Sequence, residues 1–103
     1  MPRIAQLTIQ HVITPLIIEE LIPTILYVYY DVLDSNIQDR VLFRCPCGCG
    51  DIVVLGLVTS KYQFDRYWVL TEKNNKPSLS PSIHRRTGCN SHFILNKGIV
   101  DWL

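Results

Sequence analysis

Short apolar stretches separated by polar turns run through the chain, and they predict a mostly β fold. The two longest stretches rich in Ile, Val, Leu and Tyr cover residues 24–30 and 52–58. The second is an unbroken apolar run, as in a strand covered on both faces. Further short strands are expected over residues 3–13, 41–44, 67–71, 92–95 and 99–102. About five to seven short strands fit a small sandwich or barrel.

One segment near the N-terminus has a different pattern and could form a short helix. Thr14 is a suitable capping residue, and Pro15 suits the first helical position. The helix would cover residues 16–22 and end at Pro23. The length of 103 residues fits a single β domain, residues 1–103, in which residues 1–24 form an N-terminal extension.

Charge and hydropathy exclude two classes of partner. The net charge is +1, and the densest basic pair is Arg85-Arg86, which is too little for a nucleic-acid-binding face. The apolar stretch over residues 16–30 is interrupted by Glu19, Glu20 and Pro23, so it cannot cross a bilayer. The N-terminus lacks the order of a secretory signal. We therefore expect a cytoplasmic protein in a reducing compartment, where clustered cysteines indicate metal binding or catalysis.

The arrangement of the cysteines is the decisive feature of the sequence. Cys45, Cys47 and Cys49 lie in one short loop, and Cys89 is followed three residues later by His92. Thiolates and imidazole are the ligands that Zn²⁺ selects, usually four of them in a tetrahedron. Five donors compete for four places. We favour Cys47, Cys49, Cys89 and His92, with Cys45 left at the end of the preceding strand.

The identity of the metal stays open between zinc and an iron–sulfur cluster. A C-x-H box followed by a C-x-x-H box is typical of Rieske [2Fe–2S] proteins. In this chain the first histidine of that pattern is replaced by Cys49, which leaves three cysteines and one histidine. A [2Fe–2S] cluster is therefore the alternative to Zn²⁺.

Several residues are candidates for catalysis near such a metal. Asp51, Glu72 and His84 are the candidate general bases of a metallohydrolase. In a variant of this mechanism, the metal is structural and Cys45 is the nucleophile. Residues 80–83, with the sequence Ser-Pro-Ser-Ile, are predicted to form a compact turn. A serine nucleophile there would need an adjacent base, which the sequence does not reveal.

The order of these motifs resembles a family of short bacterial metal-binding proteins of unknown function. Genes of that family often lie beside those of ubiquitin-like proteins and their activating and conjugating enzymes. The resemblance covers residues 25–103, and its two cysteine and histidine boxes are its most specific parts. The motifs are Cys45-Pro46-Cys47-Gly48-Cys49-Gly50, Trp68-Val69-Leu70, Ser78-Leu79-Ser80-Pro81-Ser82-Ile83, Gly88-Cys89-Asn90-Ser91-His92-Phe93 and Gly98-Ile99-Val100-Asp101-Trp102.

The resemblance implies a role in a bacterial ubiquitin-like conjugation pathway. The implied partners are the ubiquitin-like protein and its activating and conjugating enzymes. Such a pathway needs an activity that matures the modifier or removes it from targets, so we expect a zinc-dependent peptidase. The alternatives are a non-catalytic zinc scaffold that binds a pathway partner and a [2Fe–2S] electron-transfer domain.

Overall fold

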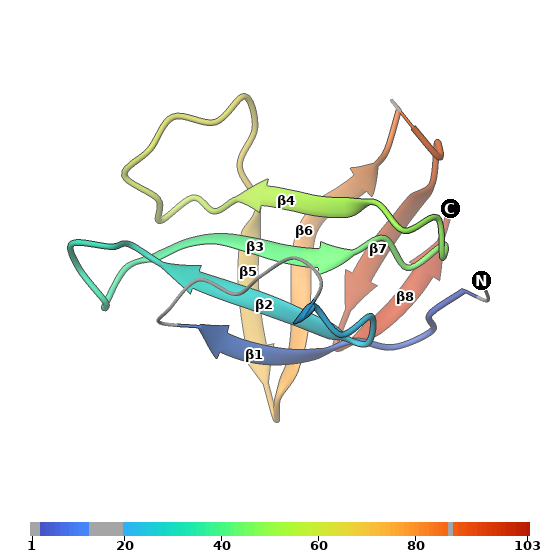
Figure 1. Cartoon of the computed structure of the whole chain (residues 1–103), viewed down its shortest axis with the longest axis horizontal. Helices are drawn as coiled ribbons and strands as arrows, with labels where there is room; N and C mark the ends of the chain where they lie inside the picture. The colour runs from blue at the N-terminus through green and yellow to red at the C-terminus, as the bar shows by residue number, and fades with distance from the viewer. Residues whose placement is uncertain (1–2, 13–19, 87) are drawn as a thin grey trace.

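Eight β-strands pair into two four-stranded sheets in a computed structural model, which describes residues 3–12, 20–86 and 88–103 (Figure 1). The mostly β prediction is therefore confirmed. The first sheet has the order β1-β2-β3-β4, and the second has the order β5-β6-β7-β8. The strands are β1 (Thr8–Val12), β2 (Ile25–Tyr30), β3 (Gln38–Arg44), β4 (Ile52–Gly56), β5 (Val69–Lys73), β6 (Lys76–His84), β7 (His92–Asn96) and β8 (Ile99–Trp102).

The pairing is antiparallel throughout, except that β1 and β2 are parallel. The strands of the second sheet cross steeply behind those of the first (Figure 1). Such a crossing is one of the two ways in which twisted sheets pack face to face. It brings the β3–β4 loop close to the β6–β7 loop, and the candidate site lies there.

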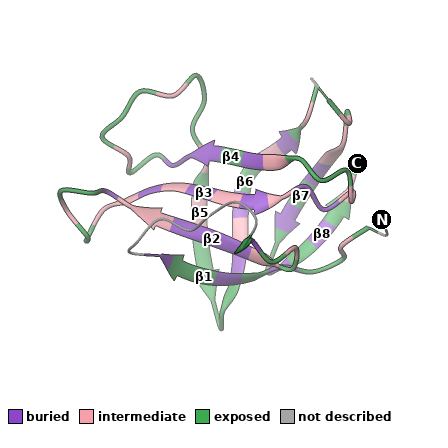
Figure 2. Ribbon diagram, in the orientation of Figure 1, coloured by how far each residue is buried: buried purple, intermediate pink, exposed green. Residues whose placement is uncertain are grey.

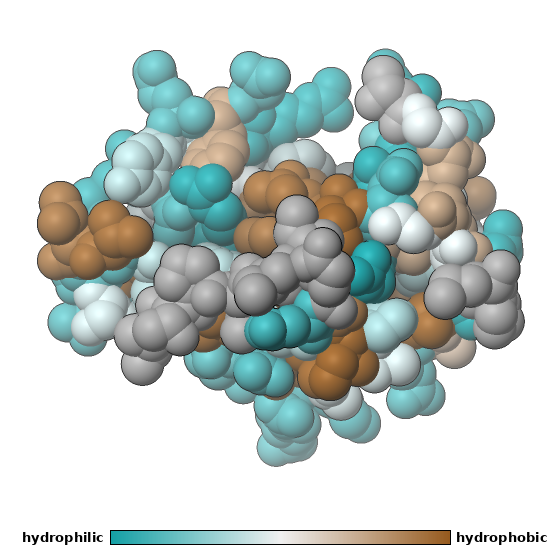
Figure 3. Space-filling model, viewed as in Figure 1, coloured by the Kyte–Doolittle hydropathy of each residue, from teal (hydrophilic) through white to brown (hydrophobic). Residues whose placement is uncertain are grey.

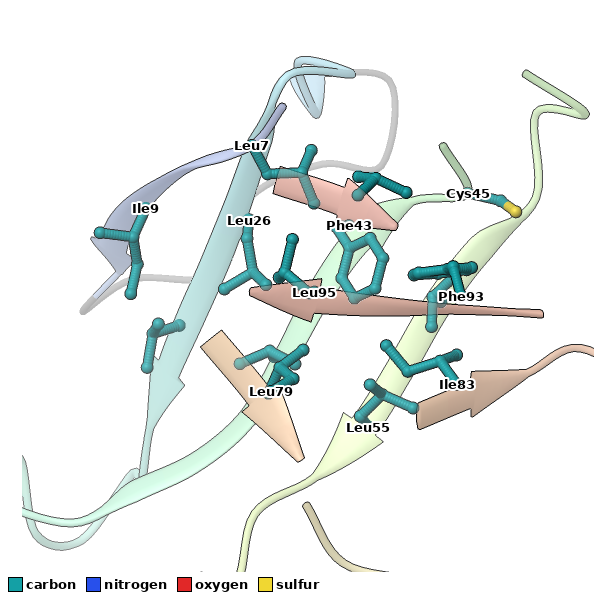
Figure 4. Packing of buried hydrophobic residues seen from close by; sticks show 14 of the residues in the cluster. Leu7, Ile9, Leu26, Phe43, Cys45, Leu55, Leu79, Ile83, Phe93 and Leu95 are labelled. Atoms are coloured by element: carbon teal, nitrogen blue, oxygen red, sulfur yellow. The ribbon is translucent and has the colours of Figure 1, made fainter. Parts of the chain in front are cut away.

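The hydrophobic core fills the space between the sheets (Figures 2 and 4). In β3 the buried positions alternate with half-buried ones, because successive side chains of a strand point to opposite faces. Phe43 of β3 meets Phe93 of β7 edge to face, with ring centroids 6.4 Å apart. Both rings are fully buried. Truncation of such a phenylalanine to alanine costs about 3–5 kcal/mol of stability.

Two expectations about the strands are corrected. The 80–83 turn does not form, since these residues lie within β6, the longest strand. The 52–58 run is not covered on both faces, because β4 is an edge strand in which the side chain of Val54 is half exposed. A continuous apolar run does not reveal by itself which of its positions face solvent.

The predicted N-terminal helix falls largely outside the described residues, at positions 16–19. Within the described ranges no α-helix is present. It follows that no helix there has the length and apolar character needed to cross a membrane.

Candidate functional site

The four cysteines converge at one end of the sheet packing. Cys45, Cys47 and Cys49 come from the loop between β3 and β4, and Cys89 comes from the loop between β6 and β7. Their Sγ atoms all lie within 4.8 Å of one another. The Sγ atom of Cys45 is 3.4 Å from that of Cys47 and 3.6 Å from that of Cys89. Figure 4 shows Cys45 at the margin of the core, with its sulfur turned away from Phe43.

The local backbone explains why three cysteines so close in sequence can meet. Gly48 and Gly50 both have φ of 90°, a conformation that is open to glycine and costly for other residues. The resulting turn is closed by a hydrogen bond from the Gly48 N–H to the Cys45 carbonyl, at 3.1 Å. It also directs the backbone N–H of Cys49 at the sulfur of Cys47, 3.3 Å away. Donors of this kind stabilise a thiolate ligand.

The thiols differ in how readily they ionise. A hydrogen bond with the Ser91 hydroxyl, at 3.2 Å, is the main cause that lowers the pKa of Cys89 to about 6. Burial is the main cause that raises the pKa of Cys45 to about 12. Cys89 is therefore largely a thiolate at neutral pH. Cys45 needs a bound cation to lose its proton.

The donor set fits a tetrahedral metal ion. Four thiolates at the usual Zn–S distance of about 2.3 Å lie about 3.8 Å apart. The Sγ–Sγ separations of 3.4 and 3.6 Å around Cys45 are close to that value. The four cysteines can thus hold a metal ion. Such a set occupies all four positions of zinc and leaves none for a catalytic water.

A serine and a histidine meet close to the cysteine cluster. Ser82 Oγ lies 3.1 Å from His92 Nε2, and both side chains are partly buried. His92 opens β7, three residues after Cys89. The register of β6 against β7 shifts between Leu79 and Ile83, so three residues of β6 face one of β7. Irregularities of this kind re-aim side chains and are frequent beside active sites.

A second histidine packs on the first. The rings of His84 and His92 are stacked, with centroids 4.5 Å apart and planes 14° apart. Nε2 of His84 hydrogen-bonds Asn90 Oδ1 at 3.0 Å, and Nε of Arg86 donates to its Nδ1 at 3.4 Å. The stacking restricts rotation of the His92 ring and helps to keep Nε2 directed at Ser82.

Ser82 and His92 line a groove of about 1080 Å³. One side of the groove is strand β4, and the other is the end of β6 with the residues that follow it. Residues from the end of the 57–68 loop also line the groove. The lining residues are Ile52, Val53, Val54, Leu55, Gly56, Phe64, Asp65, Arg66, Trp68, Pro81, Ser82, Ile83, His84, Arg85, Arg86 and His92.

A serine hydrogen-bonded to a histidine is the nucleophile and base pair that serine hydrolases use. Residues 14–103 match the model of a family described as "Bacterial ubiquitination-like system serine protease (BubE)". The chain belongs to the BubE family. Searches of curated proteins and of solved structures found no match. Membership confirms the expected association with a bacterial ubiquitin-like system. The family description names a serine protease and gives no support to zinc dependence.

No hydrogen bond joins Asp51, Glu72 or His84 to Ser82 or His92 within the described residues. Glu72 in β5 bonds His11 Nε2 of β1 at 2.8 Å and so links the two sheets. Asp51 lies 3.7 Å from Arg85 Nη2. His84 stacks on His92 and lines the groove, but its ring nitrogens face Asn90 and Arg86.

The structure brings together the sulfurs of all four cysteines, three of which belong to the preferred ligand set. Cys45 lies among the clustered sulfurs, whereas the Nε2 atom of His92 is directed at Ser82. His92 is not a member of the group of possible metal ligands in the described part of this BubE protein. Sequence reasoning does not single out Ser82, because its partner is ten positions away in the chain. The C-x-x-H spacing of Cys89 and His92 suggests a pair of metal ligands. In the structure, His92 instead contacts Ser82.

Proposed function

We propose that this chain is a serine peptidase that cleaves bonds at the C-terminus of the ubiquitin-like modifier of its own system. The observation that carries the proposal is the hydrogen bond between Ser82 Oγ and His92 Nε2 within the groove. Membership of a family described as a serine protease of a bacterial ubiquitination-like system supports the choice of substrate.

The proposed reaction is acyl transfer through Ser82. His92 Nε2 accepts the hydroxyl proton while Oγ attacks the carbonyl carbon of the scissile bond. His92 then gives this proton to the leaving group, which is an amine in a peptide or isopeptide bond. The acyl group stays on Ser82 as an ester. A water molecule, deprotonated by His92, attacks that ester. The ester bond breaks, His92 returns the proton to Ser82 Oγ, and the modifier leaves with a new carboxylate.

The four cysteines would hold Zn²⁺ in a structural role. Zinc bound there ties the β3–β4 loop to the β6–β7 loop and fixes the position of Cys89. Because His92 follows Cys89 by three residues, the same anchor positions the general base. Four thiols without a disulfide suit a reducing compartment, so the proposal places the enzyme in the cytoplasm.

The structure gives little support to the two other mechanisms, attack by a zinc-bound water and attack by Cys45. Four thiolates close the coordination sphere, so a zinc-bound water has no place in the proposed mechanism. Cys45 would be a poor nucleophile, because it is buried and its pKa is raised to about 12.

The test is cleavage of the system's own modifier fused at its C-terminus to a fluorescent reporter. Wild-type protein is expected to release the reporter, and Ser82→Ala protein is expected to release none. Ser80→Ala is the matched control, because it removes a hydroxyl two residues away on an exposed position of the same strand. Equal cleavage by wild type and Ser82→Ala, or none by wild type, would refute the proposal. In the second case a scaffold role would gain support.

A further inference from the structure

Strand β4 has an edge that no described strand covers. It is the last strand of the first sheet, and β3 is its one neighbour there (Figure 1). Cys45 N–H bonds the carbonyl of Asp51, and Leu57 N–H bonds the carbonyl of Asp39. In an antiparallel pair, bonded positions alternate with non-bonded ones. The N–H and C=O groups of Ile52 and Val54 therefore point away from β3.

The far end of this edge shows that it can accept backbone hydrogen bonds. Trp68 N–H donates to the carbonyl of Gly56 at 2.9 Å, and Val58 N–H donates to the carbonyl of Trp68 at 3.0 Å. Trp68 thus pairs with the end of the edge in a short parallel bridge. Among the described residues no backbone group is bonded to the outward side of Ile52 or Val54. Two residues with one donor and one acceptor each remain open.

The open edge lies in the groove that contains Ser82 and His92. All five residues of β4 line it. Figure 3 shows hydrophobic side chains gathered over β4, and the side chain of Val54 is half exposed. An edge with open backbone groups and apolar side chains is what a protein normally covers or charges to avoid unwanted pairing. An uncovered edge beside the candidate nucleophile indicates that β4 binds the substrate.

Two residues that line the same groove each carry a buried donor without a partner. Neither Trp68 Nε1 nor Arg85 Nη1 has a hydrogen-bond partner within the described structure. Both groups can only donate. A buried donor without a partner is costly, so each is suited to an acceptor that arrives with the substrate. Peptide carbonyls supply such acceptors.

We propose that the substrate's C-terminal chain binds in extended form along β4, as an added strand that leads its scissile bond to Ser82. The inference rests on the proposed function and adds how the substrate is held. The outward groups of Ile52 and Val54 bond alternate residues of the bound chain, as in other complexes formed by strand addition. Trp68 Nε1 donates to a substrate carbonyl at the end of the groove beside Gly56.

The direct test is amide hydrogen exchange, resolved by NMR, in full-length Ser82→Ala protein. The probe is an eight-residue peptide with the sequence of the modifier's C-terminus. With the peptide present, we expect the exchange rates of the Ile52 and Val54 amides to fall about tenfold or more. The amides of Val53 and Leu55 face β3 and serve as internal controls, because their protection should change little. Unchanged exchange at both outward amides at a saturating peptide concentration would overturn the inference.

A kinetic test uses substitutions that separate the backbone from the side chain. Val54→Pro removes an outward N–H and leaves the ladder to β3 intact, since proline is tolerated on edge strands. We expect kcat/KM for the reporter fusion to fall about tenfold or more, mainly through a higher KM. Val54→Ala retains the N–H and loses only side-chain contacts, so we expect its kcat/KM to stay at least about threefold above that of Val54→Pro.

Trp68→Phe tests the buried donor in the same assay. It removes Nε1 and keeps an aromatic ring, so we expect KM to rise about tenfold while the melting temperature stays close to that of wild type. Normal kinetics in both Val54→Pro and Trp68→Phe would refute strand addition. Such a result would leave the Ser82 mechanism untouched, because that mechanism is tested by Ser82→Ala.

Discussion

His92 Nε2 lies 3.1 Å from Ser82 Oγ, across the register shift between β6 and β7. This contact joins two segments that the sequence presents as separate motifs. His92 also follows Cys89 by three residues, so the proposed general base and one cysteine of the cluster share one segment of the chain. Under the proposed function, residues 89–92 couple metal binding to catalysis.

The first prediction concerns His92. His92→Ala is expected to lower kcat for the reporter fusion by about a thousandfold or more, because Ser82 loses its base. The melting temperature should fall only slightly, since the ring is partly exposed. The variant should also keep its metal, measured by atomic emission on purified protein. Loss of the metal together with the activity would make His92 a ligand, as the sequence alone suggests.

The second prediction concerns the ring stacked on His92. His84→Ala is expected to reduce kcat about tenfold, because the imidazole of His92 becomes free to rotate. His84→Phe keeps a flat ring in the same place and should recover most of the activity. If His84→Phe is as inactive as His84→Ala, the His84 nitrogens take part in the reaction. The proposal that His84 only positions the His92 ring would then be incorrect.

The third prediction concerns the cysteine cluster. Cys47→Ser is expected to lose stoichiometric metal, to melt at a lower temperature and to lose activity in parallel, because the 89–92 segment is no longer anchored. A strong chelator should have the same three effects on the wild-type protein. Ser82→Ala is the matched control, since it removes activity and retains the metal. Full activity in metal-free protein would show that the cluster does not position His92.

The fourth prediction concerns the wall of the groove. A Cβ atom at Gly56 would clash with the ring of Phe64. Gly56→Ala should therefore displace the 57–68 loop and lower the free energy of unfolding by about 1–3 kcal/mol. Phe64→Ala removes the ring that causes the clash. In the Phe64→Ala background, Gly56→Ala should therefore lower the free energy of unfolding by less than it does in wild type. Additive costs in urea denaturation would contradict this contact.

The β class and the cysteine cluster are predictable from the sequence because both depend on local or chemical signals. Alternating and continuous apolar runs identify most of the strands, including the hairpin that turns at Gly98, where φ is 80°. Cysteine has few roles in a reducing compartment, so three cysteines within five residues indicate a metal site by their spacing alone.

The serine–histidine pair cannot be predicted from the sequence, because it depends on tertiary register. Ser82 has no distinctive neighbours in a stretch that resembles a turn, and serine is common in turns. The residues of that stretch are instead part of β6, where the register against β7 shifts opposite Ile94. The same holds for β4, since an apolar run is compatible with a central or an edge strand.

The central claim is that Ser82 is the nucleophile, and covalent labelling tests it most directly. Full-length protein with its metal is incubated with a modifier that carries a C-terminal phosphonate ester, which reacts with activated serine hydroxyls. Intact-mass and peptide analysis should then show one adduct, on Ser82, that is absent from His92→Ala protein. An adduct on Cys45, Cys47, Cys49 or Cys89, or no adduct in protein that cleaves the reporter fusion, would contradict the account.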